Sequence, residues 1–361
     1  MILPFDIKFE NVKPIVLVRG AGDLATGVIQ ALHRAGFSLV ATEVPEPSAI
    51  RRSVALCEAV YDGRTEVEDC EAQLCSSVGE ALELLDGNAQ MQSQTAPATN
   101  DMNRDRHVDE SEHKAKPKEP APAVTSGTFQ QALKADKQEQ GQERKQKQQE
   151  QEKQQDQEEQ DAKGSTFSPP IPLLIDPSLS CLSELKPFAI VDAIIAKKNT
   201  GLQRRMAPIT IALGPGFSAG EDCDIVVETM RGHNLGRLIF SGMARPNSGI
   251  PGLIAGHDAD RVMHSPATGI IHNLAQIGDL VEAGQILADI EGVPVKATIH
   301  GVLRGLIRDG FAVSEGLKIA DIDPRYTEQT NCFTISDKAR ALGNATLQAL
   351  LILMHKNRPY L

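Results

Sequence analysis

A glycine-rich turn near the N-terminus carries residues whose types and spacing suit phosphate binding. In the stretch IVLVRGAGDLATG, Gly20, Gly22 and Ala25 stand at the G-x-G-x-x-A spacing. Such a turn lets the backbone approach a pyrophosphate, and the helix that follows points its first N–H groups at the phosphate oxygens. These residues predict a nucleotide-binding turn; the alternative is a sharp strand-to-helix corner that binds no ligand.

The elements around the turn must position it. The apolar run Ile15–Val18 is typical of a buried strand, residues 24–34 have apolar side chains at helical spacing, and Gly36 is placed to end that helix. Phe37–Ala41 predicts a second strand, and Glu43 falls where a ribose-binding acid is expected. The turn therefore lies within a strand–helix–strand unit.

Charged residues flank the glycines. Arg19 ends the first strand and is a candidate contact for an anionic group, whereas Asp23 places a carboxylate where a phosphate would lie. Arg51 and Arg52 follow the second strand, where they could accept a 2′-phosphate or start a surface helix.

Three further polar, glycine-rich stretches occupy residues 192–201, 214–220 and 231–237. Glycine permits close backbone approach, and Lys, Arg, His and Asn supply donors for phosphate or carboxylate. We expect these loops to converge on an anionic ligand, with three solvated turns as the alternative. His233 is also a candidate acid/base. The candidate ligand contacts here are Lys197, Gly214, Gly216, Arg231, His233 and Asn234.

The six cysteines show no C-x-x-C pair, and no metal site is predicted from the spacing of Cys and His. Cys332 stands just before a predicted helix, Asp337–His355, whose N-cap is Ser336. A thiol near a helix N-terminus can have a lowered pKa, which makes Cys332 a catalytic candidate; the alternative is a buried structural cysteine.

The composition excludes some classes of partner. The chain of 361 residues has a formal net charge of -11 and no Trp. Both features argue against a general binder of nucleic acid or of anionic membranes. No signal peptide and no long apolar run are present, so we expect a soluble, cytoplasmic protein.

Residues 87–168 predict a disordered insert. Apart from Gly141, the stretch Lys137–Asp161 holds only Gln, Glu, Asp, Lys and Arg, which cannot bury enough apolar surface to fold. The flanks predict one interrupted domain. Before the insert comes a helix, Val78–Leu85, that opens with the capping box SVGE. After it come two strands, Ile171–Ile175 and Phe188–Ala196.

An internal repeat lies near the C-terminus. Gly269–Ile290 aligns without gaps to Gly301–Ile322, and eight of the 22 positions are identical. The shared glycines stand where short strands must turn. The pattern resembles the biotinyl/lipoyl-type barrel-sandwich fold. The junction between the halves is too short for the hairpin of a swinging-arm carrier and places Lys296 within a strand, so we expect a packing or docking module.

These observations predict an α/β protein. A Rossmann-like nucleotide-binding sheet is interrupted by the insert and followed by a β-rich segment with strands at Ile209–Leu213, Asp224–Glu228 and Leu238–Phe240. The predicted division is 13–86 with 169–205 (Rossmann-like domain), 87–168 (disordered insert), 206–262 (β-rich middle segment), 263–325 (barrel-sandwich hybrid domain) and 326–361 (C-terminal helix).

Five stretches together resemble the YqeB-type family of the selenium-dependent molybdenum hydroxylase system. They are RGAGDLATG, TEVPEPSAIRR, VDAIIAKKNTG, ALGPGFSAGEDCDIVVETMRGHNLGR and CFTISDKARALG. The resemblance covers about Lys13–Leu85 and Ile171–Leu351. It implies an accessory protein for the maturation of molybdenum hydroxylases, which resemble xanthine dehydrogenase, with the hydroxylase and its maturation proteins as partners. It also implies an NAD(P)-binding-type Rossmann fold, distantly similar to insertion factors of the XdhC type.

The leading hypothesis is thus an accessory protein that binds NAD(P) or the dinucleotide form of the molybdenum cofactor. Gly20, Gly22 and Ala25 would admit the pyrophosphate, Glu43 would bind the ribose, and Cys332 would handle sulfur or selenium. One alternative is an NAD(P)-dependent oxidoreductase with His233 as acid/base. Another is a ligand-free scaffold that docks the apo-hydroxylase.

Overall fold

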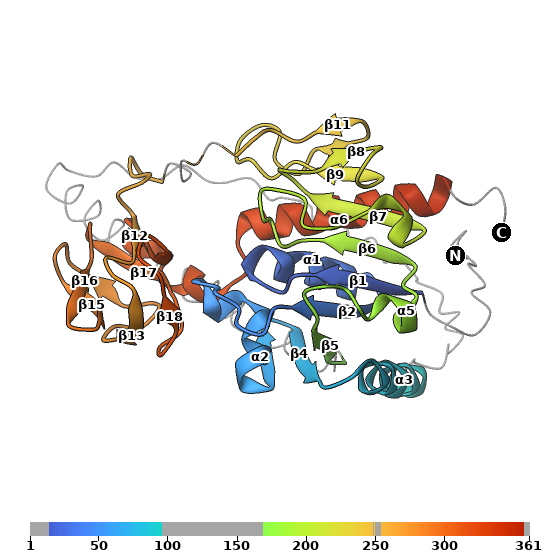
Figure 1. The fold of residues 1–361 in the computed structure, drawn as a ribbon, viewed down its shortest axis with the longest axis horizontal. Coiled ribbons are helices and arrows are strands. Elements are labelled where there is room, and N and C mark those ends of the chain that lie inside the picture. The colour runs from blue at the N-terminus through green and yellow to red at the C-terminus, as the bar shows by residue number, and fades with distance from the viewer. Residues whose placement is uncertain (1–13, 96–168, 248, 250–253, 357–361) are drawn as a thin grey trace, which may run out of the picture. The chain divides into compact units, whose positions relative to one another are not determined.

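The computed structural model describes residues 14–95, 169–247, 249 and 254–356; of residues 88–95 it describes only the helix to which they belong. These residues form a mixed α/β fold with one large sheet and several antiparallel sheets (Figure 1). The predicted disordered insert lies outside the described residues from 96 onward. Its first residues, 87–95, continue a helix, so that boundary was predicted too early.

The large sheet has the strand order β10-β9-β7-β6-β1-β2-β5-β4-β3. Its parallel strands are β1 (Ile15–Arg19), β2 (Ser38–Glu43), β4 (Cys70–Cys75), β5 (Ile171–Ile175), β6 (Ala189–Asp192), β7 (Ile209–Leu213) and β9 (Ile225–Val227). The edge strands β3 (Arg64–Val67) and β10 (Leu238–Ile239) pair antiparallel. The segment predicted as a separate β-rich middle part therefore supplies β7, β9 and β10 to this same sheet.

The sheet reverses its winding direction at β1. From β1 the chain passes to β2 on one side, and it later returns to place β6 on the other side. The loops that leave β1 and β6 thus run in opposite directions and open a crevice at the carboxyl ends of these strands, where ligands of open α/β sheets bind. The order differs from the usual dinucleotide-binding order because β5 lies between β2 and β4.

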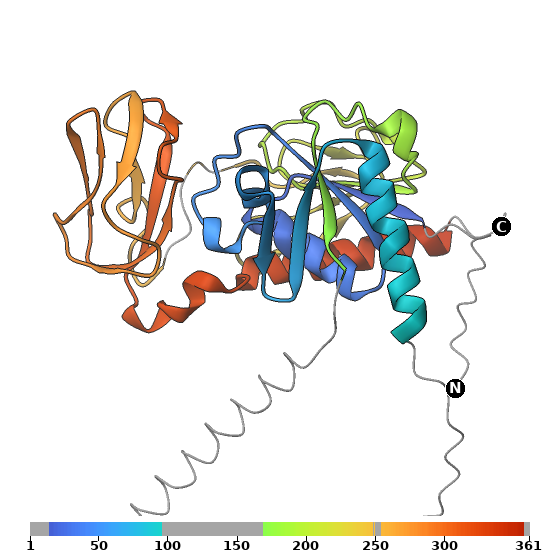
Figure 2. The same ribbon diagram turned by 90° about the horizontal axis from the view of Figure 1, so that it is seen from below.

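Helices cover both faces of the sheet (Figures 1 and 2). On one face, α1 and α6 pack against alternate strand residues such as Val16 and Val18. On the other face, α3, α5 and neighbouring loops pack against the intervening residues, among them Leu17. The helices are α1 (Asp23–Arg34), α2 (Ala59–Asp62), α3 (Val78–Thr95), α5 (Leu182–Leu185) and α6 (Asp337–Lys356), with short 3-10 helices at Arg52–Val54, Leu56–Glu58, Arg204–Met206, Tyr326–Glu328 and Thr330–Phe333.

The predicted helix ends are confirmed where local signals are strong. Gly36 has φ of 83° and ends α1, with its N–H donating to the His33 carbonyl. The Ser336 hydroxyl accepts from the Ala339 N–H at 3.2 Å, which is the predicted N-cap of α6.

Two glycines let α1 and α6 cross in close contact. A Cβ on Gly27 would lie 2.5 Å from the Ala339 carbonyl oxygen, and one on Gly343 would lie 2.1 Å from the Gly27 carbonyl oxygen. The two backbones therefore touch, and α6 belongs structurally to the sheet rather than forming a separate C-terminal element.

The repeat folds as eight strands in two sheets with the orders β12-β19-β17-β14 and β16-β15-β13-β18. We call these eight strands the β-module. Its strands are β12 (Val262–His264), β13 (Gly269–Asn273), β14 (Leu280–Val281), β15 (Ile286–Ile290), β16 (Val293–Lys296), β17 (Gly301–Leu306), β18 (Ala312–Val313) and β19 (Lys318–Asp323). A separate pair, β8 (Ser218–Ala219) and β11 (Gly242–Met243), lies beside the large sheet.

The two halves of the β-module exchange strands. β14 of the first half pairs with β17 of the second, and β18 of the second pairs with β13 of the first. When the two halves are aligned as in the sequence repeat, each strand of one sheet corresponds to a strand of the other sheet. The same alignment makes β12 correspond to β16. The predicted repeat is confirmed and extends to β12 and β16, and Lys296 lies in a strand as predicted.

The repeated glycines have the same backbone conformation in both halves. Gly269 and Gly301 have φ of 158° and 150°. The pairs Gly278/Gly310 and Gly284/Gly316 also share positive φ, at 97°/75° and 87°/81°. Glycine is required at such angles, which explains why these positions are identical between the halves.

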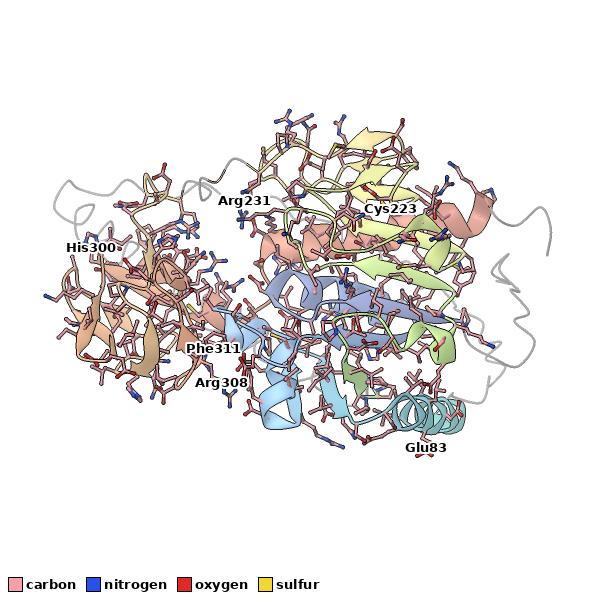
Figure 3. The ribbon with its side chains drawn as sticks, in the orientation of Figure 1. Glu83, Cys223, Arg231, His300, Arg308 and Phe311 are labelled. Carbon is pink, nitrogen blue, oxygen red and sulfur yellow. The ribbon has the colours of Figure 1, made fainter. Side chains whose placement is uncertain are left out.

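Side-chain contacts join the β-module to the large-sheet region. Arg308, labelled in Figure 3, donates to Glu58 at 2.9 Å and to Asp62 at 2.6 Å. Nε of Arg52 donates to the Leu306 carbonyl at 2.8 Å, and the Leu306 N–H donates to the Ile50 carbonyl at 2.8 Å. The residues after β2 are thus held against β17.

Candidate anion-binding site

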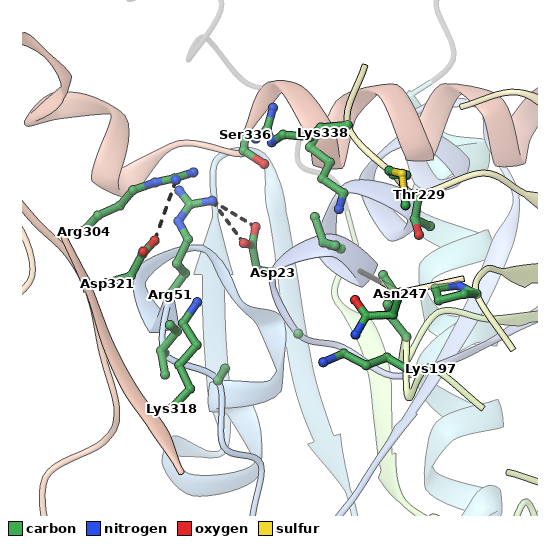
Figure 4. A pocket seen from close by; sticks show the side chains of 18 of the residues that line it. Asp23, Arg51, Lys197, Thr229, Asn247, Arg304, Lys318, Asp321, Ser336 and Lys338 are labelled. Atoms are coloured by element: carbon green, nitrogen blue, oxygen red, sulfur yellow. Dashed lines mark hydrogen bonds and ion pairs between the residues drawn. The ribbon is translucent and has the colours of Figure 1, made fainter. Parts of the chain in front are cut away.

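A cavity of about 680 Å³ lies at the carboxyl ends of the parallel strands (Figure 4). We call it the basic pocket. The loops after β1, β2, β6, β7 and β9 line it, together with the first turn of α6 and residues of β17 and β19. The predicted contacts Gly22, Asp23, Lys197 and Arg231 all lie here, as does Arg51.

The lining of the basic pocket is strongly cationic. Among the described residues that line it, eight are basic and two, Asp23 and Asp321, are carboxylates. This excess stands in a chain whose formal net charge is -11. A local cluster of cations against the overall charge is the signature of an anion-binding site. The eight basic residues are Arg51, Lys197, Arg231, Arg245, Arg261, Arg304, Lys318 and Lys338.

The start of α1 faces the basic pocket with its backbone N–H groups open. Gly22 is the N-cap, and no side chain caps the helix. A Cβ on Gly22 would have no neighbour within 4 Å, so this position borders open space. Uncapped N–H groups and the helix dipole together favour an anion at this point.

Asp23 does not block the start of α1. Both of its carboxylate oxygens accept from Nη1 of Arg51 at 3.1 Å. Arg51 is only 5% exposed, and its Nη2 donates to the carbonyls of Asn331 and Thr334 at 3.3 and 3.4 Å. Its Nε is buried and has no hydrogen-bond partner among the described residues. A buried donor without an acceptor is costly, which makes this Nε a candidate contact for a ligand atom or an ordered water.

The other basic residues of the pocket outnumber the carboxylates among the described lining residues. Arg261 pairs with Asp321, and Arg304 lies 3.8 Å from the same carboxylate. Burial, and after it the neighbouring Arg51, lowers the pKa of Arg304. Desolvation in the basic pocket likewise lowers the pKa of Lys318 and of Lys338. Burial is the main cause of all three shifts, and neighbouring guanidinium groups add to it.

The loop after β6 is held in a strained conformation beside the basic pocket. Ile195 and Lys197 have φ of 51° and 64°, and a β-branched residue at positive φ is rare. Two of the predicted glycines leave room for this loop. A Cβ atom on Gly20 would lie 2.8 Å from Ile194 and one on Gly216 would lie 2.5 Å from Lys198, so any larger residue would clash with the loop. These two glycines shape the loop and do not line the cavity. Such strain concentrates at ligand sites.

Two predicted ligand contacts are engaged inside the protein. Nη1 of Arg19 donates to Asp192 and to the Thr200 hydroxyl, both at 3.0 Å, and Nη2 donates to the Pro177 carbonyl at 3.0 Å. The Glu43 carboxylate accepts from the Ala21 N–H at 2.8 Å and from the backbone N–H of the residue after it at 2.9 Å. Arg19 therefore ties β1 to β6, and Glu43 fixes the glycine-rich turn.

Other predicted residues lie away from the cavity lining. Ala25 is buried in α1, and a Cβ on Gly214 would lie 2.3 Å from the side chain of Ala244. His233 is exposed and Asn234 is half-buried, and neither lines the basic pocket.

Cys332 lies in the protein interior. It is fully buried, and burial raises its pKa, which is opposite to the lowered value that a position before a helix N-terminus suggests. Its Sγ lies 3.8 Å from the Glu328 carbonyl. Burial thus favours the alternative of a buried structural cysteine at position 332 over a reactive thiol.

Metal-ligating groups do not gather in the described part of the chain. No group of three or more His, Cys, Asp or Glu side chains is placed there to hold a metal ion. Glu228 instead accepts from the N–H groups of Met230 and Arg245 at 2.8 and 2.9 Å. Within the same residues, no helix is long and apolar enough to cross a membrane.

Sequence reasoning missed most of the cations, because five distant segments supply them. One signal was present within the repeat. The second half has Arg304 and Lys318 where the aligned positions of the first half have His272 and Ile286. Departures from an otherwise matching repeat can thus mark a functional face. The lining residues that were not predicted include Arg245, Asn247, Arg261, Arg304, Lys318, Ser336 and Lys338.

Comparisons with known proteins place the chain in a family. No family model and no solved structure matches it. A curated protein of Escherichia coli strain K12, named "Uncharacterized protein YqeB", is 38% identical over 342 residues, or 95% of this chain. The chain spans about half the length of that relative, 48%. Since the similarity includes nearly all of this sequence, the chain belongs to the YqeB-type family that its motifs resemble.

Proposed function

We propose that this chain is an accessory protein for the maturation of a molybdenum hydroxylase, and that it binds a nucleotide-bearing ligand in the basic pocket. The pathway comes from the resemblance to YqeB-type proteins. The ligand class rests on one observation: eight cations and the uncapped start of α1 surround one cavity. The cavity volume lies within the range typical of small-molecule sites.

The residues of the basic pocket fit a diphosphate. Gly22 would admit it to the start of α1, where Arg51 and Lys197 would add charge-assisted hydrogen bonds. Of the two ligands considered, NAD(P) would bring hydride chemistry, whereas the molybdenum cofactor dinucleotide would be carried as cargo. Glu43 already accepts from two backbone N–H groups, one of them in the turn, which speaks against its use as the ribose acid of an NAD site, and we favour the cofactor dinucleotide.

We further propose finer identities for the two regions. The large sheet would be a Rossmann-like domain with one strand inserted, a proposal supported by the position of the basic pocket at the switch point of a parallel sheet. The β-module, with its exchanged strands, would be a barrel-sandwich hybrid. We also propose that the protein acts in the cytoplasm with the hydroxylase and its maturation proteins as partners.

Substitutions at two neighbouring glycines test the ligand site. Gly22 has φ of -71° and borders open space, so Gly22→Leu should fold, with a change in unfolding free energy within about 1 kcal/mol, and fill the cavity entrance. Gly20 has φ of 97° and a close neighbour, so Gly20→Ala should destabilise the fold by about 2 kcal/mol.

The measurement is a thermal-shift panel on the full chain with NAD, NADP, CTP and the molybdenum cofactor dinucleotide. A ligand at about 100 times its Kd stabilises by about 2.7 kcal/mol, which is several degrees in Tm. We expect a shift for the wild type that Gly22→Leu abolishes. No shift with any of these ligands, or an equal shift in Gly22→Leu, would contradict the proposal.

A further inference from the structure

The cations of the basic pocket form two groups. Figure 4 shows Arg51, Arg304 and Lys318 on one side and Lys338 and Lys197 on the other, with Asp23 between them. The first group includes residues of β17 and β19, so the β-module supplies part of the wall.

Among the described lining residues, cationic side chains outnumber carboxylates in each group. On the β-module side, Asp321 is shared between Arg261 and Arg304. Lys318 adds another cation there. On the opposite side Arg231 pairs with Asp337, while Lys197 and Lys338 both line the cavity. A single phosphate at the start of α1 would leave at least one of these groups uncompensated, and an uncompensated charge in a low-dielectric site is costly.

Arg51 connects the β-module side to the start of α1. It is buried, it holds Asp23 at the first turn of α1, and its Nε lacks an acceptor. A ligand group that reaches this Nε lies between the helix start and the β-module cations. The cavity, at about 680 Å³, is large enough for a ligand that extends beyond one phosphate.

We propose that the ligand of the basic pocket has at least two separate anionic groups, one at the start of α1 and one bound by Arg304 and Lys318 of the β-module. This inference rests on the proposed function and deepens it. It assigns the β-module a direct part in ligand binding instead of the packing or docking role expected from sequence. The ligand would therefore be a diphosphate ester that carries a second anionic group away from the diphosphate. A diphosphate ester whose far end is neutral or cationic would not meet this requirement.

The test compares ligands that differ in anionic groups. Calorimetry on the full chain would measure Kd for pyrophosphate, tripolyphosphate, NAD and NADP. The variants are Arg304→Gln and Lys318→Gln. The charge-matched control is Lys296→Gln, because Lys296 is exposed at the end of β16 and does not line the cavity. Circular dichroism and Tm would show that each variant is folded; since Lys318 is exposed, Lys318→Gln serves even if Arg304→Gln fails to fold.

We expect tripolyphosphate and NADP to bind more tightly than pyrophosphate and NAD. Loss of a charged hydrogen bond should weaken the two larger anions by about tenfold or more in each variant, and leave pyrophosphate and NAD within about twofold. Binding of all four unchanged by both variants would overturn this inference and leave the proposed function standing. No binding of any of the four would count against both.

Discussion

The two sheets of the β-module have the same backbone and different outer surfaces. Arg304 and Lys318, with Arg261 just before β12, occupy positions equivalent to His272, Ile286 and Val293. The first set lines the basic pocket, whereas Ile286 and Val293 are exposed at 46% and 39%.

The contrast extends to the contact with the large-sheet region. Leu306 is fully buried and its N–H bonds to the Ile50 carbonyl, while its equivalent Leu274 is 68% exposed. The glycines and apolar residues that recur in both halves therefore specify the fold. The basic side chains on the outer surface of the β12-β19-β17-β14 sheet have no Lys or Arg at the equivalent positions of the other sheet, and they are the ones available to a ligand.

The largest difference between the halves should appear at the conserved aspartate. Asp321 is 4% exposed and pairs with Arg261, whereas its equivalent Asp289 is half-buried and accepts from the Gly292 N–H. Asp321→Asn removes the buried carboxylate that pairs with Arg261 and lies near Arg304, and it should lower the free energy of unfolding by about 3 kcal/mol. Asp289→Asn should cost about 1 kcal/mol or less.

Urea unfolding of both variants checks this prediction. Added pyrophosphate should return more stability to Asp321→Asn than to Asp289→Asn, because the former leaves a larger positive excess in the basic pocket. Equal losses of unfolding free energy in the two variants would contradict this difference between the two sheets.

A smaller difference is expected at the paired glycines that begin β13 and β17. A Cβ on Gly301 would lie 2.3 Å from the Asp323 backbone oxygen, whereas one on Gly269 would meet the flexible side chain of Glu291 at 2.4 Å. Gly301→Ala should therefore cost about 2 kcal/mol and Gly269→Ala about 1 kcal/mol, as measured by chemical denaturation. A reversed order would show that the first half is packed more rigidly than the second.

The smallest effect is a pH dependence of stability that only one half should show. Desolvation lowers the pKa of Lys318 from its usual 10.5. The folded protein then loses this proton at a lower pH than the unfolded chain, so the penalty is present at neutral pH and fades as the pH rises toward about 10.4.

Lys318→Gln should remove this penalty. Without ligand, the variant should be more stable than the wild type at pH 7 by a few tenths of a kcal/mol, since the ammonium is partly solvated. The gain should vanish near pH 10.4. Ile286→Gln, the matched change in the first half, should give no pH-dependent difference in thermal unfolding followed from pH 7 to pH 10.5. A pH-independent gain in Lys318→Gln would count against the electrostatic explanation.

Local patterns predicted the elements well. The strands Ile171–Ile175 and Ile209–Leu213 have the predicted bounds, since a short run of apolar residues between polar ends specifies a buried strand. The repeat was also visible, because glycines at positive φ recur at fixed spacing. What failed was the grouping of elements: β7, β9 and α6 join the large sheet through contacts that are distant in sequence.

The candidate site was predicted only in part for the same reason. Gly22 and Lys197 stand in recognisable glycine-rich stretches, and both line the basic pocket. Arg19 stands in the same kind of stretch, yet the folded protein uses it to hold Asp192. The cations at positions 304 and 338 come from other elements, and only tertiary folding brings them to the cavity.

The contact between Gly27 and Gly343 has a consequence for synthesis on the ribosome. Almost the whole described chain separates these two residues, so α1 emerges long before the helix that packs against it. At about 5–20 residues per second, the apolar surface of α1 waits for roughly 15 to 60 seconds before α6 exists to cover it. The nascent chain therefore exposes this apolar surface to chaperones and to other polypeptides until translation has passed residue 356.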